Sequence, residues 1–143
     1  MIQRVSLGLE EAQRAIAAVL EEAKREGRPV AVAVVDANGD VISCARMDGA
    51  HARVLRFAVR KAYTAAVMGR DTLTFKKELQ ERWRTLSDYG DPSFTTLQGG
   101  LPIISEGKVV GAIGAGGSAR ERDVEMAQIG VRAIGVSTKR KNR

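Results

Sequence analysis

The sequence predicts an α/β chain of the α+β kind, in which helices cover both faces of an antiparallel sheet. Two apolar segments each contain a tight-turn signal, at Asp36–Asp40 and at Glu106-Gly107, and these indicate two β-hairpins. Apolar residues at helical spacing precede, separate and follow the hairpins. Because tight hairpins join antiparallel strands, the predicted order is α-ββ-α-α-ββ-α, a three-layer α-β-α sandwich. The alternative is that one face or edge of the sheet is buried in an oligomer.

Four helices are expected from the apolar periodicity. They are predicted to run from Leu9 to Gly27, from 51 or 52 to 68, from 74 to 86 and from 118 to 134. Ser6 or Gly8 can cap the first helix. The pattern Ser118-Ala-Arg-Glu121 is typical of a capping box and places the start of the last helix at Ser118.

The strands are expected where valine, isoleucine and alanine dominate. The first hairpin is predicted at 30–35 and 41–47, and the second at 102–105 and 108–115. Residues 89–96 contain Gly90 and Pro92 and are predicted to form a loop.

Composition indicates one globular domain over residues 1–143. Hydrophobic residues make up 44% and charged residues 28%, close to the average of soluble proteins. No apolar run approaches the length of a membrane span, and the first residues lack the apolar core of a signal peptide. A single cysteine, Cys44, fits a reducing compartment. We therefore expect a cytoplasmic protein with no membrane partner.

The net charge of +6 invites a nucleic-acid interpretation, but its distribution argues against one. Lys139, Arg140, Lys141 and Arg143 carry four of the six positive charges. Residues 136–143 therefore resemble a solvated, flexible basic tail. Aromatic residues make up only 4%, too few for a base-stacking surface. No nucleic-acid partner is predicted.

The clearest candidate for a binding site is the glycine-rich turn at Gly116, Gly117 and Ser118, where a strand meets a helix. Glycines let a ligand approach the backbone, and the N–H groups and dipole of a helix start favour an anion. The alternative is a tight turn that packs on a neighbouring element.

Several charged or polar residues are further candidates. Arg46 could hold a carboxylate in bidentate fashion, or pair with Asp48. His51, the single histidine, could serve as a base, a metal ligand or a haem axial ligand, or simply face solvent. Lys61 flanks the apolar face of its helix and could act as a base or bind a carboxylate, or could extend its amine to solvent.

Two aromatic residues border the irregular loop. Trp83 and Tyr89 could line a pocket for a flat or anionic ligand, and anchoring of an interface is an equal alternative.

Several motifs, in order, resemble the GlcG/HbpS-like haem-binding family, which includes the C-terminal domain of PduO-type proteins. They are the opening Leu7–Ala23 with Pro29–Asp36, Arg46-Met-Asp-Gly-Ala50, Arg60-Lys-Ala-Tyr-Thr-Ala65, Gly99-Gly-Leu-Pro-Ile103 and Gly111-Ala-Ile-Gly114. The resemblance implies a profilin-like fold, usually assembled as a homo-oligomer. Some members of the family bind haem or iron, and others belong to catabolic operons. The resemblance therefore predicts the fold more specifically than it predicts the function.

Three hypotheses about function follow. The first is an oligomeric protein that binds haem, iron or another small ligand, with His51 as the haem axial candidate. The second is an enzyme that acts on a small carboxylated metabolite by proton transfer. In it the 116–118 turn holds the anion, Arg46 clamps it, and Lys61 or Asp48 moves the proton. The third is a non-catalytic structural subunit with a large apolar interface.

Overall fold

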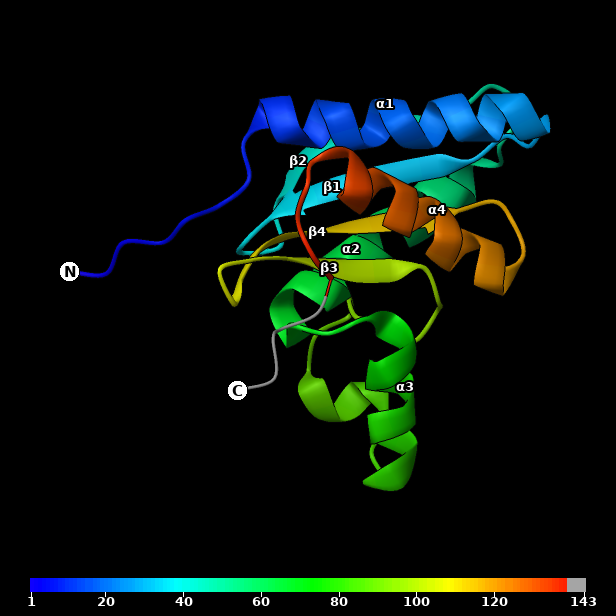
Figure 1. Cartoon of the computed structure of the whole chain (residues 1–143). Coiled ribbons are helices and arrows are strands. Elements are labelled where there is room, and N and C mark those ends of the chain that lie inside the picture. Colours follow the sequence, from blue (N-terminus) through cyan, green and yellow to red (C-terminus); the bar gives the residue numbers. More distant parts are fainter. Residues whose placement is uncertain (139–143) are drawn as a thin grey trace.

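A computed structural model describes residues 1–138, which form helices on both sides of one four-stranded sheet (Figure 1). The elements, in chain order, are α1 (Leu9–Glu26), β1 (Ala31–Asp36), β2 (Val41–Arg46), α2 (Ala52–Met68), α3 (Thr72–Glu81), the 3-10 helix η1 (Leu86–Tyr89), β3 (Gly100–Ser105), β4 (Lys108–Gly116) and α4 (Arg120–Ala133). The α+β class and both hairpins are confirmed.

The strands lie in the order β2-β1-β4-β3, and each neighbouring pair is antiparallel. Each hairpin supplies one central and one edge strand. The two hairpins meet through β1 and β4, where Ala31 pairs with Gly116. This pairing places the end of β4, and the glycine turn that follows it, beside the start of β1.

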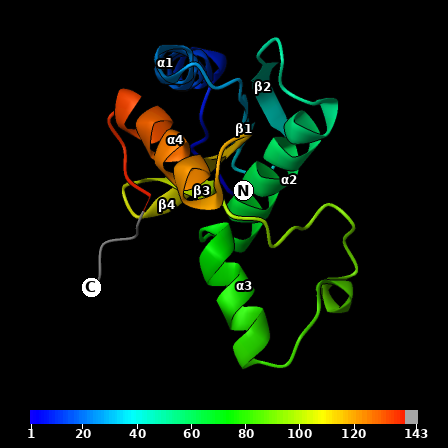
Figure 2. The same cartoon turned by 90° about the vertical axis from the view of Figure 1, so that its right-hand side faces the viewer.

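The two faces of the sheet pack against different helices (Figures 1 and 2). Along β1, Val32 and Val34 belong to a core cluster with apolar residues of α1 and α4. The alternate residue Ala33 packs with Ala58 of α2. This is the alternation that a strand imposes, since successive side chains point to opposite faces.

Helix α2 approaches the sheet very closely. A Cβ added at Gly114 of β4 would lie 2.1 Å from the carbonyl oxygen of Ala58. One added at Gly100 of β3 would lie 2.3 Å from the carbonyl oxygen of Lys61. These two glycines are therefore packing residues, and they allow α2 to lie directly on the strands.

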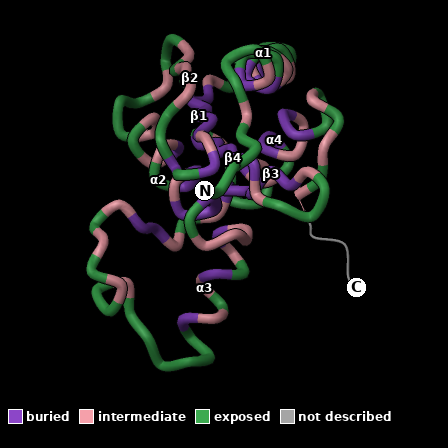
Figure 3. The backbone as a smooth tube through the Cα atoms, turned by 90° about the vertical axis from the view of Figure 1, so that its left-hand side faces the viewer, coloured by how far each residue is buried: buried purple, intermediate pink, exposed green. Residues whose placement is uncertain are grey.

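Helix α3 and η1 lie beyond the sheet and are held by an aromatic cluster. The side chains of Phe75, Tyr89 and Phe94 meet edge to face, with ring centroids 5.5 to 5.8 Å apart. Much of the backbone in this region is exposed or half-buried (Figure 3).

The predicted bounds of the third helix were wrong. It starts at Thr72, because the Asp71 carboxylate caps it by accepting the N–H of Thr74. It ends at Glu81, and Trp83 soon after has the left-handed φ of 55°.

The predicted capping box at Ser118 was also wrong. Helix α4 starts at Arg120, and its N-cap is Ala119, which makes no side-chain cap bond. The N–H of Ser118 donates instead to Asp123 Oδ1, at 3.0 Å. The carboxyl group of Asp123 therefore takes the place of a Ser118 cap, and it binds the turn that precedes the helix.

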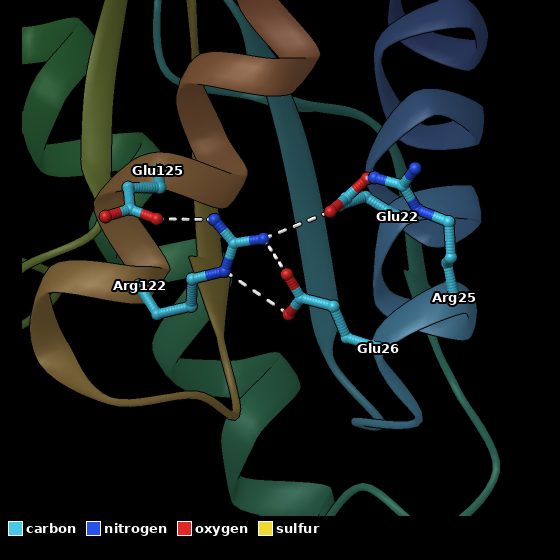
Figure 4. Close-up of polar contacts among 5 residues, drawn as sticks. All are labelled: Glu22, Arg25, Glu26, Arg122 and Glu125. Carbon is cyan, nitrogen blue, oxygen red and sulfur yellow. Dashed lines mark hydrogen bonds and ion pairs between the residues drawn. The ribbon is translucent and has the colours of Figure 1, made fainter.

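Two long-range contacts tie the C-terminal part of the chain to the rest. Arg122 of α4 contacts Glu22 and Glu26 of α1 and Glu125 of its own helix (Figure 4). Ser137 forms an isolated antiparallel bridge with Ile104 on the outer edge of β3. The predicted flexible tail falls largely on residues 139–143, which lie outside the described residues.

Candidate functional site

A pocket of about 410 Å³ opens where the start of α2, the end of β4 and the turn before α4 converge. Its lining comes from α2, α3, α4 and the two segments that flank the second hairpin. The lining residues are His51, Arg53, Val54, Phe57, Lys61, Lys76, Thr96, Leu97, Gln98, Gly116, Gly117, Ser118, Arg120 and Asp123. Five of the sequence-predicted site residues are in this set: His51, Lys61, Gly116, Gly117 and Ser118.

Lys61 and Asp123 form a buried ion pair beneath this pocket. The exposed fraction is 4% for Lys61 and 6% for Asp123. The Lys61 Nζ donates to the carbonyl oxygen of Ala115 at 2.8 Å and to Asp123 Oδ2 at 3.3 Å. Three elements therefore meet at this amine: α2 carries it, β4 supplies the carbonyl oxygen and α4 supplies the carboxylate.

Asp123 joins the ion pair to the glycine turn. One of its carboxylate oxygens accepts from the Lys61 Nζ, and the other accepts the N–H of Ser118. The turn is thus held by the same carboxylate that orients the amine. A φ of +108° at Gly117 favours glycine at that position.

Burial perturbs both members of the pair. It lowers the pKa of the Lys61 amine, and the charge of Asp123 opposes this effect only in part. It raises the pKa of the Asp123 carboxyl, against the Lys61 charge and the Ser118 hydrogen bond. Both shifts favour the uncharged forms, as desolvation requires. Two perturbed titratable groups that line one pocket make it a candidate functional site.

The rim of the pocket is positively charged. Arg53, Lys76 and Arg120 line it from α2, α3 and α4, and Asp123 is the single acidic residue in the lining. Low-dielectric walls lined by one sign of charge concentrate the opposite sign. The pocket is therefore suited to an anionic ligand.

His51 lies at the mouth of the pocket as the N-cap of α2, where its side chain is exposed and makes no cap hydrogen bond. It also lines an adjoining hollow of about 340 Å³, together with Val54 and Gly117. The imidazole thus stands between two hollows that share one wall.

The remaining predicted site residues lie elsewhere. Arg46 and Asp48 line a separate groove of about 590 Å³ between α1 and the end of β2. Arg46 is therefore not placed to clamp an anion held at the 116–118 turn. Trp83 is 95% exposed beyond α3, and Tyr89 packs in the aromatic cluster. Neither aromatic residue lines the pocket beside Lys61.

Sequence reasoning missed Asp123 and the three rim cations. Asp123 lies five residues after Ser118, so its carboxylate could have been considered as an alternative partner for the turn. No local signal points to Arg53, Lys76 or Arg120, because they come from three helices that only the tertiary fold brings together.

The family profile described as "Haem degrading protein HbpS-like" matches residues 7–132. The chain belongs to this HbpS-like family. Protein GlcG of Escherichia coli is 33% identical over 114 residues, which cover 80% of this chain and 84% of GlcG. Corrinoid adenosyltransferase PduO of Citrobacter freundii is 29% identical over 136 residues. These cover 94% of this HbpS-like chain but only 41% of PduO.

Solved structures agree closely with the fold. A crystal structure of HbpS has a TM-score of 0.86 at 34% identity, covering 94% of both chains. The crystal structure of a PduOC:haem complex has a TM-score of 0.86 at 28% identity, covering 95% of this chain and 100% of that one. Within residues 1–138 of the HbpS-like chain, the helices are too short or too polar to cross a bilayer.

Proposed function

We propose that this HbpS-like protein binds haem in the pocket between α2 and α4. The observation that carries the proposal is an exposed imidazole, that of His51, at the mouth of a pocket with a cationic rim. A PduOC relative was crystallised as a haem complex, which supports the same ligand class for this fold.

The residues of the pocket fit haem in three respects. His51 offers an unencumbered nitrogen for iron. Val54, Phe57 and Leu97 offer apolar surface for the porphyrin ring. Arg53, Lys76 and Arg120 offer partners for its carboxylates. Bound haem would supply redox and oxygen chemistry, and the chain itself would supply the axial nitrogen, the apolar wall and the charges.

A haemin titration tests the proposal. Wild-type protein is expected to show a Soret shift that saturates at about one haem per chain, because one imidazole defines one site. His51→Ala should lose the saturable shift and regain it when free imidazole is added. Gln13→Ala, an exposed change on α1, is the matched control and should titrate like the wild type.

Two outcomes would contradict haem binding at this site. One is a Soret change that rises without saturation in every variant. The other is a saturable shift that survives His51→Ala unchanged.

The buried amine of Lys61 favours a second candidate function. In it the pocket holds a small carboxylated metabolite, and Lys61 exchanges a proton with it while Asp123 holds the amine in place. Such an anion should bind saturably to the wild-type protein in calorimetry. Binding should weaken several-fold in Arg53→Gln because one rim charge is lost. Equal affinity in Arg53→Gln would contradict this candidate.

Assembly into a homo-oligomer stays part of the proposal. The exposed apolar side chains of Val41, Val67 and Trp83 are available to an interface. Light scattering coupled to gel filtration is expected to give a mass that is a multiple of 15.4 kDa. A mass of one chain over a range of concentrations would contradict assembly.

A further inference from the structure

We propose that Lys61 is a carbonyl-reactive nucleophile, which forms an imine with a small aldehyde that carries a carboxylate. The inference rests on the second candidate function for the binding of a small anion, and differs from it in the chemistry assigned to the amine. Four features of the pocket support it.

The amine is buried but faces a pocket. Lys61 is 4% exposed, yet it lines the pocket together with the polar side chains of Thr96 and Gln98. A lysine that merely extends its amine to water would leave its charged end exposed. Here the whole side chain points inward from α2 and ends at the carbonyl oxygen of Ala115 and the carboxylate of Asp123.

Two glycines border the Lys61 amine. An added Cβ would lie 3.2 Å from the Lys61 Nζ at Gly99 and 3.5 Å at Gly116, and Gly116 also lines the pocket. A side chain at residue 116 would therefore contact the amine and reduce the pocket space beside it that a carbonyl group could use. The carbonyl oxygen of Ala115 accepts a hydrogen bond from the same nitrogen and holds it in place.

The environment favours a neutral and hence nucleophilic amine. Burial lowers the pKa of Lys61, and desolvation is the usual means by which a lysine is activated for imine formation. The carboxyl group of Asp123, whose pKa burial raises, lies at hydrogen-bond distance and can accept the proton that the ammonium loses.

The rim selects the substrate class. Arg53, Lys76 and Arg120 surround the pocket from three helices, so an aldehyde with a carboxylate is drawn in while an uncharged one is not. The carboxylate would bind at the rim, and the carbonyl carbon would reach the amine beneath it.

The reaction balances within the site. The neutral amine adds to the carbonyl carbon, a C–N bond forms, and a proton moves from nitrogen to the former carbonyl oxygen to give a carbinolamine. Asp123 then donates its proton to the leaving hydroxyl group, the C–O bond breaks, and water departs as the C=N bond forms. The proton freed from nitrogen returns to Asp123, and nothing is oxidised or reduced.

Reductive trapping tests the inference. The full chain is incubated with succinic semialdehyde and cyanoborohydride, and the modified lysines are mapped by peptide mass spectrometry. Lys61 is expected to react several-fold faster than the exposed Lys77, because its lowered pKa leaves a larger fraction of the amine neutral. Butanal, which has the same length and no carboxylate, should show no such preference for Lys61.

Variants separate reactivity from folding. Gly116→Ala should slow trapping at Lys61 several-fold, because its methyl group would contact Nζ and reduce the space beside the amine, while leaving trapping at Lys77 unchanged. Arg53→Gln should reduce the preference for succinic semialdehyde over butanal. Lys77→Gln is the matched control and should leave trapping at Lys61 unchanged. Thermal melting establishes that each variant is folded.

Succinate, which lacks the aldehyde, distinguishes the two proposals. Saturable succinate binding with trapping at Lys61 no faster than at Lys77 would overturn imine formation and leave anion binding standing. Absence of succinate binding, together with equal trapping of succinic semialdehyde and butanal, would overturn both. Unchanged trapping at Lys61 in Gly116→Ala would also contradict the placing of the reacting carbonyl group beside residue 116.

Discussion

At the scale of single residues, the Lys61–Asp123 pair is the feature that most sets this domain apart from a plain apolar core. Two charges are held beneath the surface with exposed fractions of 4% and 6%, and burial works against the charge on each. A buried pair of this kind contributes little net stability, yet removing one partner is costly because the other charge then lacks compensation.

Asp123→Asn is therefore expected to lower the free energy of unfolding by about 3 kcal/mol. The double variant Lys61→Met/Asp123→Leu should recover most of that loss, since it removes both desolvated charges together. Urea unfolding of the single and double variants gives the comparison. If the double variant loses as much stability as Asp123→Asn, then losing the bond to Ser118, which leucine cannot accept, costs as much as leaving the Lys61 charge unpaired.

The sequence pointed to Lys61 but not to its partner. A lysine beside the apolar face of a helix is a local signal, because helical spacing reveals which side it occupies. Asp123 lies 62 residues further along the chain, and its side chain reaches Lys61 only after both helices have packed on β4. Pairings of this kind depend on tertiary structure, which periodicity does not encode.

At the scale of elements, the closeness of α2 to the sheet depends on glycine. Gly111, Gly114, Gly116 and Gly117 read as one glycine-rich motif in the sequence, but they have two different roles. Gly114 permits packing against Ala58, whereas Gly116 and Gly117 line the pocket. The packing alternative is confirmed for Gly114, whereas ligand binding at the 116–118 turn stays a prediction.

Gly114→Ala should destabilise the fold by about 3 kcal/mol, because its methyl group would overlap the Ala58 carbonyl oxygen and push α2 from the sheet. Gly27→Ala is the control: Gly27 has a φ of 68° and no atom within 4 Å of an added Cβ. That change should cost only about 1 kcal/mol, from backbone strain alone. If chemical denaturation gives equal losses in the free energy of unfolding for Gly114→Ala and Gly27→Ala, then α2 can move away from the sheet without destabilising the fold.

At the scale of the whole molecule, the order of hairpins and helices along the chain was predictable from the sequence. The way in which the two hairpins join in one sheet was not. Each tight turn fixes which strands are antiparallel neighbours, and apolar periodicity assigns the helices. The order β2-β1-β4-β3 also brings the glycine turn after β4 beside the start of β1. No local pattern specifies that the two hairpins join through β1 and β4, and the site depends on that junction.

The charge of the whole molecule links its stability to pH. The chain carries a net charge of +6, so protonating its carboxylates in acid increases self-repulsion in the folded state. Two carboxylates resist protonation. Arg122 lowers the pKa of Glu26 across the junction of α1 and α4 (Figure 4). The hydroxyl of Tyr63 lowers the pKa of Asp91. Asp123 acts in the opposite sense, because its pKa is raised in the folded state.

Arg122→Gln tests this linkage through the junction of α1 and α4. A carboxylate whose pKa is lower in the folded than in the unfolded state adds stability above its ordinary value, which is 4.5 for Glu26. That stability disappears as the pH falls through the folded-state pKa. The variant should therefore be less stable than the wild type at about pH 7, and the difference should shrink as the pH falls below 4.5 and Glu26 becomes protonated in both proteins. Urea unfolding midpoints of both proteins across this pH range measure the stability difference. Added salt should reduce this difference at neutral pH, because the side chains of Arg122 and Glu26 are partly exposed. A stability difference that stays constant while Glu26 becomes protonated would mean that Arg122 stabilises the junction by packing its side chain and not by its charge.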